Sequence, residues 1–248
     1  MRTANPALSA KTFENLPYAG TGDELMTLEG TVNKTALLFL LLLLAAIWTW
    51  NIFFTTNDFS AVLPWMMGGA LGGLAVGFLI AFKKEWSAVT APIYAVLQGL
   101  FLGGLSAMME FKYEGIVIQA VGLTFGTFAM VLFAYKTKII QATENFKLGV
   151  FAATGGIALV YMVSMVLGFF GIHIPFIHDS GLFGIGFSLF VVVIAAMNLV
   201  LDFDFIEQGA NNNAPKFMEW YSAFGLMVTR IWLYVEILRL LAKLREHK

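Results

Sequence analysis

Three ionisable residues in the C-terminal part of the chain lie inside apolar stretches, where charged side chains are rare. Asp202 lies in the segment Leu201–Ile206, and Arg230 and Glu236 lie in Thr229–Glu236. A charge at membrane depth costs about 2.5–3.5 kcal/mol on insertion scales, so such residues usually serve a function. Arg230 and Glu236 are each expected to have a partner on another helix.

A structural role remains open for each of these residues. Asp202 and Asp204 also fit an interfacial position, solvated by lipid headgroups. Glu236 has Arg239 three residues further on, which is the spacing of an intrahelical ion pair. Arg230 lies six residues before Glu236, about 120° away around a helix, so these two are poor partners within one helix. Arg230 is then a counter-charge for a carboxylate on another helix, or a side chain that reaches to the membrane surface.

The other polar residues point to no enzyme. Asn198 lies four residues before Asp202 on the same helical face, and it and Asp204 are expected to support the candidate site. The chain has no cysteine, which excludes disulfides, zinc–thiolate sites and cysteine nucleophiles. It contains no nucleotide-binding, HExxH or GxSxG motif. An intramembrane enzyme that uses two carboxylates therefore ranks last among the functions considered, and no cofactor is expected.

The elements that carry these residues are predicted to be transmembrane helices. Hydrophobic residues make up 59% of the 248 residues and charged residues 12%, against about 45–50% and about 25% in soluble domains. A helix of roughly 20 apolar residues crosses a bilayer. Seven segments of this kind occur, at about 35–54, 61–82, 88–109, 115–135, 148–170, 181–203 and 220–241. The predicted fold class is an all-α membrane protein with seven transmembrane helices.

Glycines recur at a spacing of four in the second and third of these segments. The pairs are Gly68 with Gly72, Gly69 with Gly73, and Gly99 with Gly103. Small residues at this spacing let helix backbones approach closely in lipid. Helix packing is the favoured interpretation, and a narrow path or a moving helix lined by glycine is the alternative.

The domain organisation and the orientation follow from the polar segments. Residues 1–33 are predicted to form a polar cytoplasmic tail, and residues 34–248 the transmembrane domain. Lysine and arginine favour cytoplasmic loops, and their alternation along the chain puts the N-terminus in the cytoplasm. The C-terminal tail disagrees, because seven crossings place its Arg239, Lys243, Arg245 and Lys248 outside. An incompletely crossing last helix and a dominant effect of the earlier loops both remain open.

Five pieces of the chain, in a fixed order, carry a resemblance to a known family. They are Asn5-Pro6 with Lys11-Thr12-Phe13; Met26-Thr27 through Thr35; Ala91-Pro92-Ile93-Tyr94-Ala95 through Gly103; Leu201-Asp202-Phe203-Asp204-Phe205-Ile206; and Glu219-Trp220-Tyr221 through Leu241. Together they span nearly the whole chain. In this order the pieces resemble the Bax inhibitor family, also called the TMBIM or YccA-like family, in its bacterial branch with a long N-terminal tail.

The resemblance implies a fold of six helices around a more polar seventh, and a function as a pH-sensitive calcium leak. By motif, Asp202 at the end of the sixth helix and Glu236 in the seventh are the gate and pH sensor, joined by a shared proton or hydrogen bond. Glu236 stands where the relatives usually have Asp. Arg230 is the candidate counter-charge, and Ca²⁺, attracted by Asp202 and Glu236, is expected as the transported ion.

The resemblance also implies a location and an alternative function. The location is the bacterial inner membrane, with the lipid bilayer as the first partner. The alternative is a membrane regulator that binds another membrane protein, such as a membrane protease or a stress-response complex, through its N-terminal tail. A net charge of −1, without a basic stripe before the last ten residues, gives no sign of a nucleic-acid partner.

Overall fold

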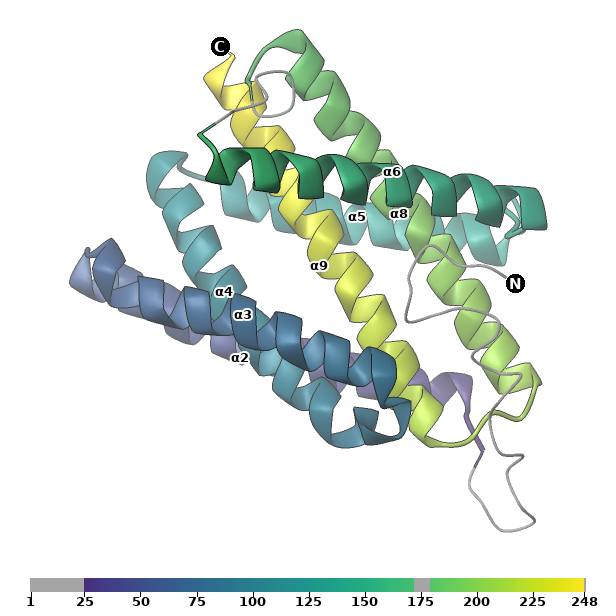
Figure 1. Cartoon of the computed structure of the whole chain (residues 1–248). Coiled ribbons are helices and arrows are strands. Elements are labelled where there is room, and N and C mark those ends of the chain that lie inside the picture. Colours follow the sequence, from purple (N-terminus) through teal and green to yellow (C-terminus); the bar gives the residue numbers. More distant parts are fainter. Residues whose placement is uncertain (1–24, 172–178, 248) are drawn as a thin grey trace. The chain divides into compact units, whose positions relative to one another are not determined.

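The computed structural model describes residues 25–171 and 179–247. Within these ranges the long elements are helices: α2 (Leu28–Thr56), α3 (Phe59–Phe82), the 3₁₀ helix η1 (Lys84–Trp86), α4 (Ser87–Lys112), α5 (Ile116–Lys136), α6 (Glu144–Phe169), α8 (Leu182–Asn211) and α9 (Phe217–Glu246). Figure 1 shows them in chain order by colour. Residues 1–24, which make up most of the predicted tail, lie outside the described part.

The helices confirm the predicted fold class. Among the described residues, six helices are long and apolar enough to cross a membrane: α2, α3, α4 with η1, α5, α6 and α8. The seventh long helix, α9, is interrupted by charged residues and corresponds to the predicted polar last segment. Each of the seven predicted apolar segments coincides with one of these helices. The chain is therefore an all-α, multi-pass membrane protein.

The chain divides into two compact units, and α8 and α9 contribute to both. The α5–α6 unit contains α5, α6, the part of α8 that ends at Asp204, and α9 from Thr229 onward. The α2–α4 unit contains α2, α3, α4, the end of α8 from Phe205 and the start of α9 up to Val228. The three candidate residues Asp202, Arg230 and Glu236 therefore belong to the α5–α6 unit.

Helix α4 packs against both α2 and α3, and glycines make this packing possible (Figure 1). A Cβ atom on Gly69 of α3 would overlap the backbone carbonyl oxygen of Leu97, and one on Gly99 of α4 would overlap that of Leu42. Gly68, by contrast, has open space beside it. Gly69 and Gly99 thus support the helix-packing interpretation of the glycine spacing, because only a residue without a side chain allows this approach.

Side-chain caps set the starts of α2 and α6. The Thr27 hydroxyl accepts a hydrogen bond from the backbone N–H of Gly30 at 2.9 Å, so α2 begins at Leu28. The Thr143 hydroxyl accepts the N–H of Phe146 at 3.3 Å and starts α6 in the same way. A hydroxyl at this position pairs an N–H that the helix leaves without a partner. Residues 28–33, predicted as the end of the tail, are therefore the first turns of α2.

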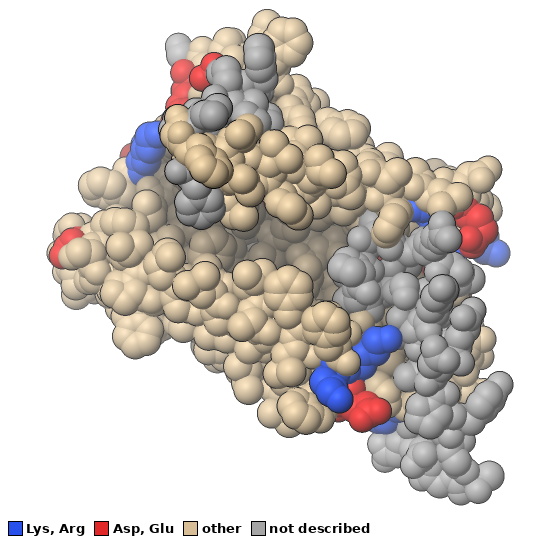
Figure 2. All heavy atoms as spheres, in the orientation of Figure 1, with Lys and Arg blue, Asp and Glu red and all other residues tan. Residues whose placement is uncertain are grey.

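The described surface is rich in apolar side chains. Large hydrophobic residues on six helices are at least half exposed, among them Leu44, Leu71, Phe125 and Met162. In the face seen in Figure 2, charged side chains form only small groups. Such a surface fits a lipid environment, because a soluble protein rarely exposes apolar patches of this extent.

Candidate functional site

Asp202 is a fully buried carboxylate, with an exposed fraction of 0%. The groups that act on its charge are the hydroxyl of Thr229 and the guanidinium of Arg230, both on α9. Burial of this extent favours a position inside the α5–α6 unit over the headgroup-solvated alternative. A buried carboxylate is costly unless it is well paired, which makes Asp202 the most unusual residue of the predicted site.

Arg230 lies inside the same unit. Its guanidinium carbon is 3.7 Å from the centroid of the Phe128 ring on α5, and its Nε is buried without a hydrogen bond. It also interacts electrostatically with Asp202. A guanidinium over an aromatic face is stabilised by about 2 kcal/mol when water is excluded. The counter-charge role of Arg230 stays a prediction.

Glu236 is bonded by two side chains, Tyr161 and Arg239. The hydroxyl of Tyr161 on α6 lies 3.0 and 3.1 Å from the two carboxylate oxygens of Glu236. Nη1 of Arg239 lies 2.9 and 3.1 Å from the same two oxygens, and it also donates to the Tyr161 hydroxyl at 2.7 Å. The intrahelical pair of Glu236 with Arg239, left open by the sequence, is thus present. We call these three residues the Tyr161–Glu236–Arg239 cluster.

The two carboxylates are not joined by a hydrogen bond in this structure. Asp202 interacts with Thr229 and Arg230, whereas Glu236 lies six residues beyond Arg230. Six residues of α-helix span about 9 Å along its axis. Asp202, on α8, therefore lies beside a different level of α9 from that of Glu236, and a proton shared directly between them stays a prediction.

Asn198 and Asp204 both connect α8 to α6. The Asn198 amide donates to the hydroxyl of Thr154 at 2.9 Å and to the carbonyl of Ile194 at 2.9 Å. Asp204 forms an ion pair with the buried Lys147, whose Nζ lies 2.9 Å from the carboxylate. These contacts hold the helix that carries Asp202. The supporting role predicted for both residues stays a prediction.

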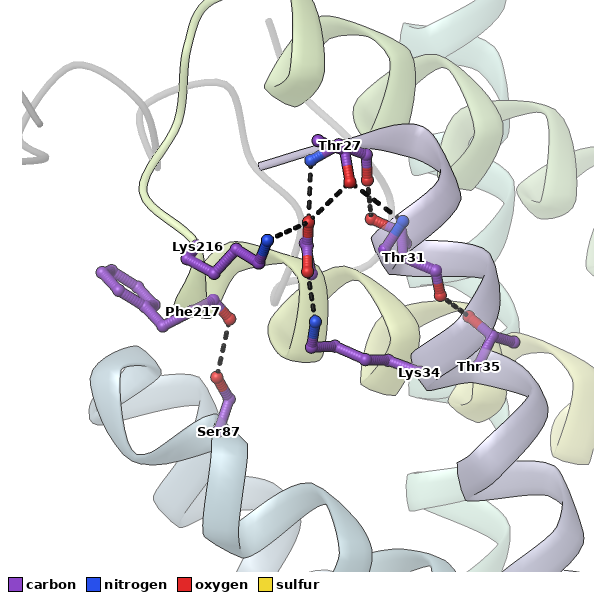
Figure 3. Close-up of polar contacts among 9 residues, drawn as sticks. Thr27, Thr31, Lys34, Thr35, Ser87, Lys216 and Phe217 are labelled. Carbon is purple, nitrogen blue, oxygen red and sulfur yellow. Dashed lines mark hydrogen bonds and ion pairs between the residues drawn. The ribbon is translucent and has the colours of Figure 1, made fainter. Parts of the chain in front are cut away.

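A second polar cluster, in the α2–α4 unit, was not anticipated from the sequence. Its centre is Glu219, a carboxylate in the first turn of α9 with an exposed fraction of 0%. The backbone N–H and the hydroxyl of Thr27 both donate to Oε1 of Glu219, each at 2.8 Å. Lys34 forms an ion pair with Oε2, and Lys216 lies 3.7 Å from Oε1. Figure 3 shows Thr27, Lys34 and Lys216 pointing toward one carboxylate.

The backbone around this cluster is fitted to the carboxylate. A Cβ atom on Gly30 would overlap the carboxyl group of Glu219, so a residue without a side chain is needed there. The N–H of Met26 donates to the carbonyl of Ala214 at 2.7 Å, and Leu25 pairs with Pro215. The segment before α2 is thereby attached to the connection between α8 and α9. No local sequence pattern indicates this attachment, because Thr27 and Glu219 are 192 residues apart.

No group of three or more His, Asp or Glu side chains suited to hold a metal ion occurs among the described residues.

Comparison with known proteins decides the family. A family model described as Bax inhibitor 1 like matches residues 5–246. The chain belongs to this family. The match includes all seven long helices, and it confirms the resemblance seen in the sequence. No curated protein and no solved structure matches the chain significantly.

Proposed function

We propose that this member of the Bax inhibitor family is a pH-sensitive calcium leak channel of the bacterial inner membrane. Asp202 and Glu236 are its gate residues, and its N-terminus lies in the cytoplasm. The observation that carries the proposal is the carboxylate of Asp202, which is fully buried in a membrane helix beside the positive charge of Arg230. A carboxylate in this position is rare unless it binds a proton or a cation in the working cycle.

The charges around Asp202 give the gate a direction. When Asp202 carries a proton, the positive charge of Arg230 remains and opposes the entry of a cation. When Asp202 loses the proton, its negative charge balances Arg230, and its oxygens become ligands for Ca²⁺. Glu236 adds a second carboxylate further along α9, balanced by Arg239. Calcium flux is therefore expected to increase as the pH rises.

The direct test is flux through the purified protein in liposomes that contain a calcium-sensitive dye. We expect a slow Ca²⁺ influx that rises several-fold from acidic to alkaline pH. Asp202→Asn leaves Arg230 unbalanced at every pH, so flux should be low and independent of pH. Glu236→Gln should lower the flux by weakening the attraction for the cation.

Asp58→Asn is the matched control. Asp58 is the exposed N-cap of α3, and asparagine caps a helix as well as aspartate does. This variant removes a carboxylate outside the site, so its flux should equal that of the wild type. If Asp202→Asn and Glu236→Gln leave the flux and its pH dependence unchanged, the proposal is wrong. No flux at any pH would contradict it as well, and would leave the alternative of a membrane regulator.

A further inference from the structure

The short turn between α3 and α4 presents two lysines at one end of the α2–α4 unit. Lys83 follows the last residue of α3, and Lys84 begins η1. The turn lies beside the start of α9, where the hydroxyl of Ser87 donates to the carbonyl of Phe217 at 3.1 Å (Figure 1). Both lysines and this part of α9 belong to one compact unit, so their contacts form a single local structure.

Lys84 is a half-buried cation without an anionic partner. Its Nζ lies 5.7 Å from the centroid of the Tyr221 ring on α9, so the ring helps to hold the side chain in place. Within the described part of the chain, Lys84 forms no ion pair. The next residue, Glu85, is exposed and pairs with neither lysine. A partly desolvated ammonium group therefore remains free to bind an anion from outside the chain.

Two further lysines at this end of the unit differ from Lys84, because both are paired. Lys34 and Lys216 form ion pairs with the buried carboxylate of Glu219. Lys34 also lies 5.5 Å from the centroid of the Trp220 ring. The negative charge of Glu219 is thus shared by these two lysines and does not balance Lys84.

The surface that adjoins the two lysines is apolar. Phe82, Trp86 and Val89 are all more than half exposed. Phe78 lies four residues before Phe82 and is also exposed, so the two share one face of α3. Ile93 repeats this arrangement after Val89 on α4. Both helices are candidate membrane spans, and tryptophan is enriched where hydrocarbon meets the headgroups, so we expect the lysines at headgroup depth.

We propose that Lys84, with Lys83 beside it, binds the headgroup phosphate of an anionic phospholipid. The acyl chains of this lipid lie along the exposed apolar faces of α3 and α4. An anionic lipid fits better than a soluble phosphate, because it contacts the lysines and the apolar surface at once. A zwitterionic lipid carries its own cation beside the phosphate and gains less from the lysines. The site lies outside the proposed gate and does not depend on the leak function.

The test is tryptophan quenching by brominated lipids in the full-length protein, reconstituted in phosphatidylethanolamine vesicles. Bromine atoms on the acyl chains quench a neighbouring indole, and Trp86 follows Lys84 closely in the turn. The difference between the wild type and Trp86→Phe isolates the signal of Trp86 from those of the other tryptophans. At equal mole fractions, we expect brominated phosphatidylglycerol to bind beside Trp86 more than about fivefold better than brominated phosphatidylcholine.

Variants of the two lysines identify the binding groups. Lys84→Gln should lower the preference for the anionic lipid about fivefold, which is the effect of one lysine at a membrane surface. Lys84→Arg keeps the charge and should keep the preference. Lys112→Gln is the matched control, because Lys112 lies at the other end of α4, over the ring of Tyr113 at 4.8 Å. If Lys84→Gln does not fold, the exposed Lys83→Gln should by itself lower the preference.

Three outcomes would overturn the proposal. The first is equal quenching of Trp86 by the two brominated lipids in the wild type. The second is an equal loss of preference in Lys84→Gln and Lys112→Gln, which would mean that the overall charge of the protein attracts the lipid. The third is displacement of the lipid by glycerol phosphate, the soluble form of the headgroup, which would identify a site for free phosphate. The experiment does not measure Ca²⁺ flux, so failure of the leak function would leave its result unchanged.

Discussion

Glu219 shows at the scale of single residues how a charge is held inside the α2–α4 unit. Its carboxylate is fully buried, yet it accepts two hydrogen bonds from Thr27 and forms an ion pair with Lys34. A buried charge of this kind stabilises a structure only while its partners are in place. The same reasoning applies to Glu236, whose carboxylate is held by Tyr161 and Arg239.

Replacing Glu219 by glutamine should destabilise the protein. Glutamine keeps the shape and an acceptor for Thr27, but it leaves the positive charge of Lys34 in a largely buried position without its partner. We expect a loss of about 2–3 kcal/mol in the free energy of unfolding, measured by thermal or denaturant unfolding in detergent. Glu29→Gln, an exposed change in the first turn of α2, is the control and should cost less than about 0.5 kcal/mol. Equal losses in the two variants would show that the Glu219 cluster is not stabilising.

The effect of Gly30→Ala on stability should depend on the residue at position 219. The change should destabilise the wild-type protein and stabilise a Glu219→Ala variant. In the wild-type background, the Cβ atom added at position 30 would collide with the Glu219 carboxylate and disturb its bonds to Thr27 and Lys34. Gly30→Ala alone should therefore be less stable than the wild type. In a Glu219→Ala background the collision is gone, and alanine in a helix is favoured over glycine by up to about 1 kcal/mol. A double-mutant cycle of unfolding free energies measures this. If the effects of the two changes on the unfolding free energy are additive, the close contact between position 30 and the Glu219 carboxylate is contradicted.

How much of the site could be predicted depends on the distance along the chain between partners. The pairing of Glu236 with Arg239 was open to prediction, because a spacing of three residues places both on one helical face. The partner Tyr161 is 75 residues away from Glu236, and Thr27 is 192 away from Glu219. Nothing in a local pattern specifies such pairs, since they form only when helices pack.

At the scale of elements, the lipid environment makes the helices predictable and their ends less so. An apolar run of about 20 residues must satisfy its backbone groups internally, so it forms a helix wherever it occurs. The start of α2 was placed at Thr35 by hydropathy, but the Thr27 cap moves it to Leu28. A cap depends on one hydroxyl group, which hydropathy does not register.

Glycine packing between α2 and α4 can be tested at this scale. Gly99→Ala would place a methyl group against the backbone of Leu42, which cannot move without shifting α2. We expect a loss of about 1–3 kcal/mol in unfolding free energy, as for other overpacked sites. Gly122→Ala in α5, where nothing lies within 4 Å of the added atom, is the matched control and should be neutral or stabilising. If Gly99→Ala is as stable as the control, close packing is not the reason for glycine there.

At the scale of the whole molecule, the remaining question is on which side of the membrane each connection lies. Lysines flank the connection between α3 and α4 and that between α5 and α6, whereas the short link between α2 and α3 has none. By the positive-inside rule, we expect the α3–α4 and α5–α6 connections to lie in the cytoplasm. The basic C-terminal tail opposes this order. Part of its charge is internal, however, because Lys243 is buried and donates to the carbonyl of Gly184.

Single-cysteine labelling in intact cells should resolve the orientation, and the chain suits it because it has no cysteine of its own. Glu85→Cys and Gln141→Cys should be protected from a membrane-impermeant maleimide until the cells are opened. Thr56→Cys and Glu114→Cys should react from outside. All four positions are exposed and lie at or near helix ends, so the label can reach them once it is on the correct side.

The same experiment tests whether α9 completes a crossing. Seven crossings from a cytoplasmic N-terminus place Arg245→Cys outside, so this cysteine should react in intact cells. We expect the earlier loops to determine the side on which the C-terminal end of α9 lies. The first helices usually dominate topology, and the buried Lys243 contributes little free charge. Protection of Arg245→Cys, with the other four positions as predicted, would mean that α9 enters and leaves on the cytoplasmic side. The basic residues of the C-terminal tail would then belong to a helix that does not span the bilayer. The carboxylate of Glu236 would be accessible from the cytoplasm alone.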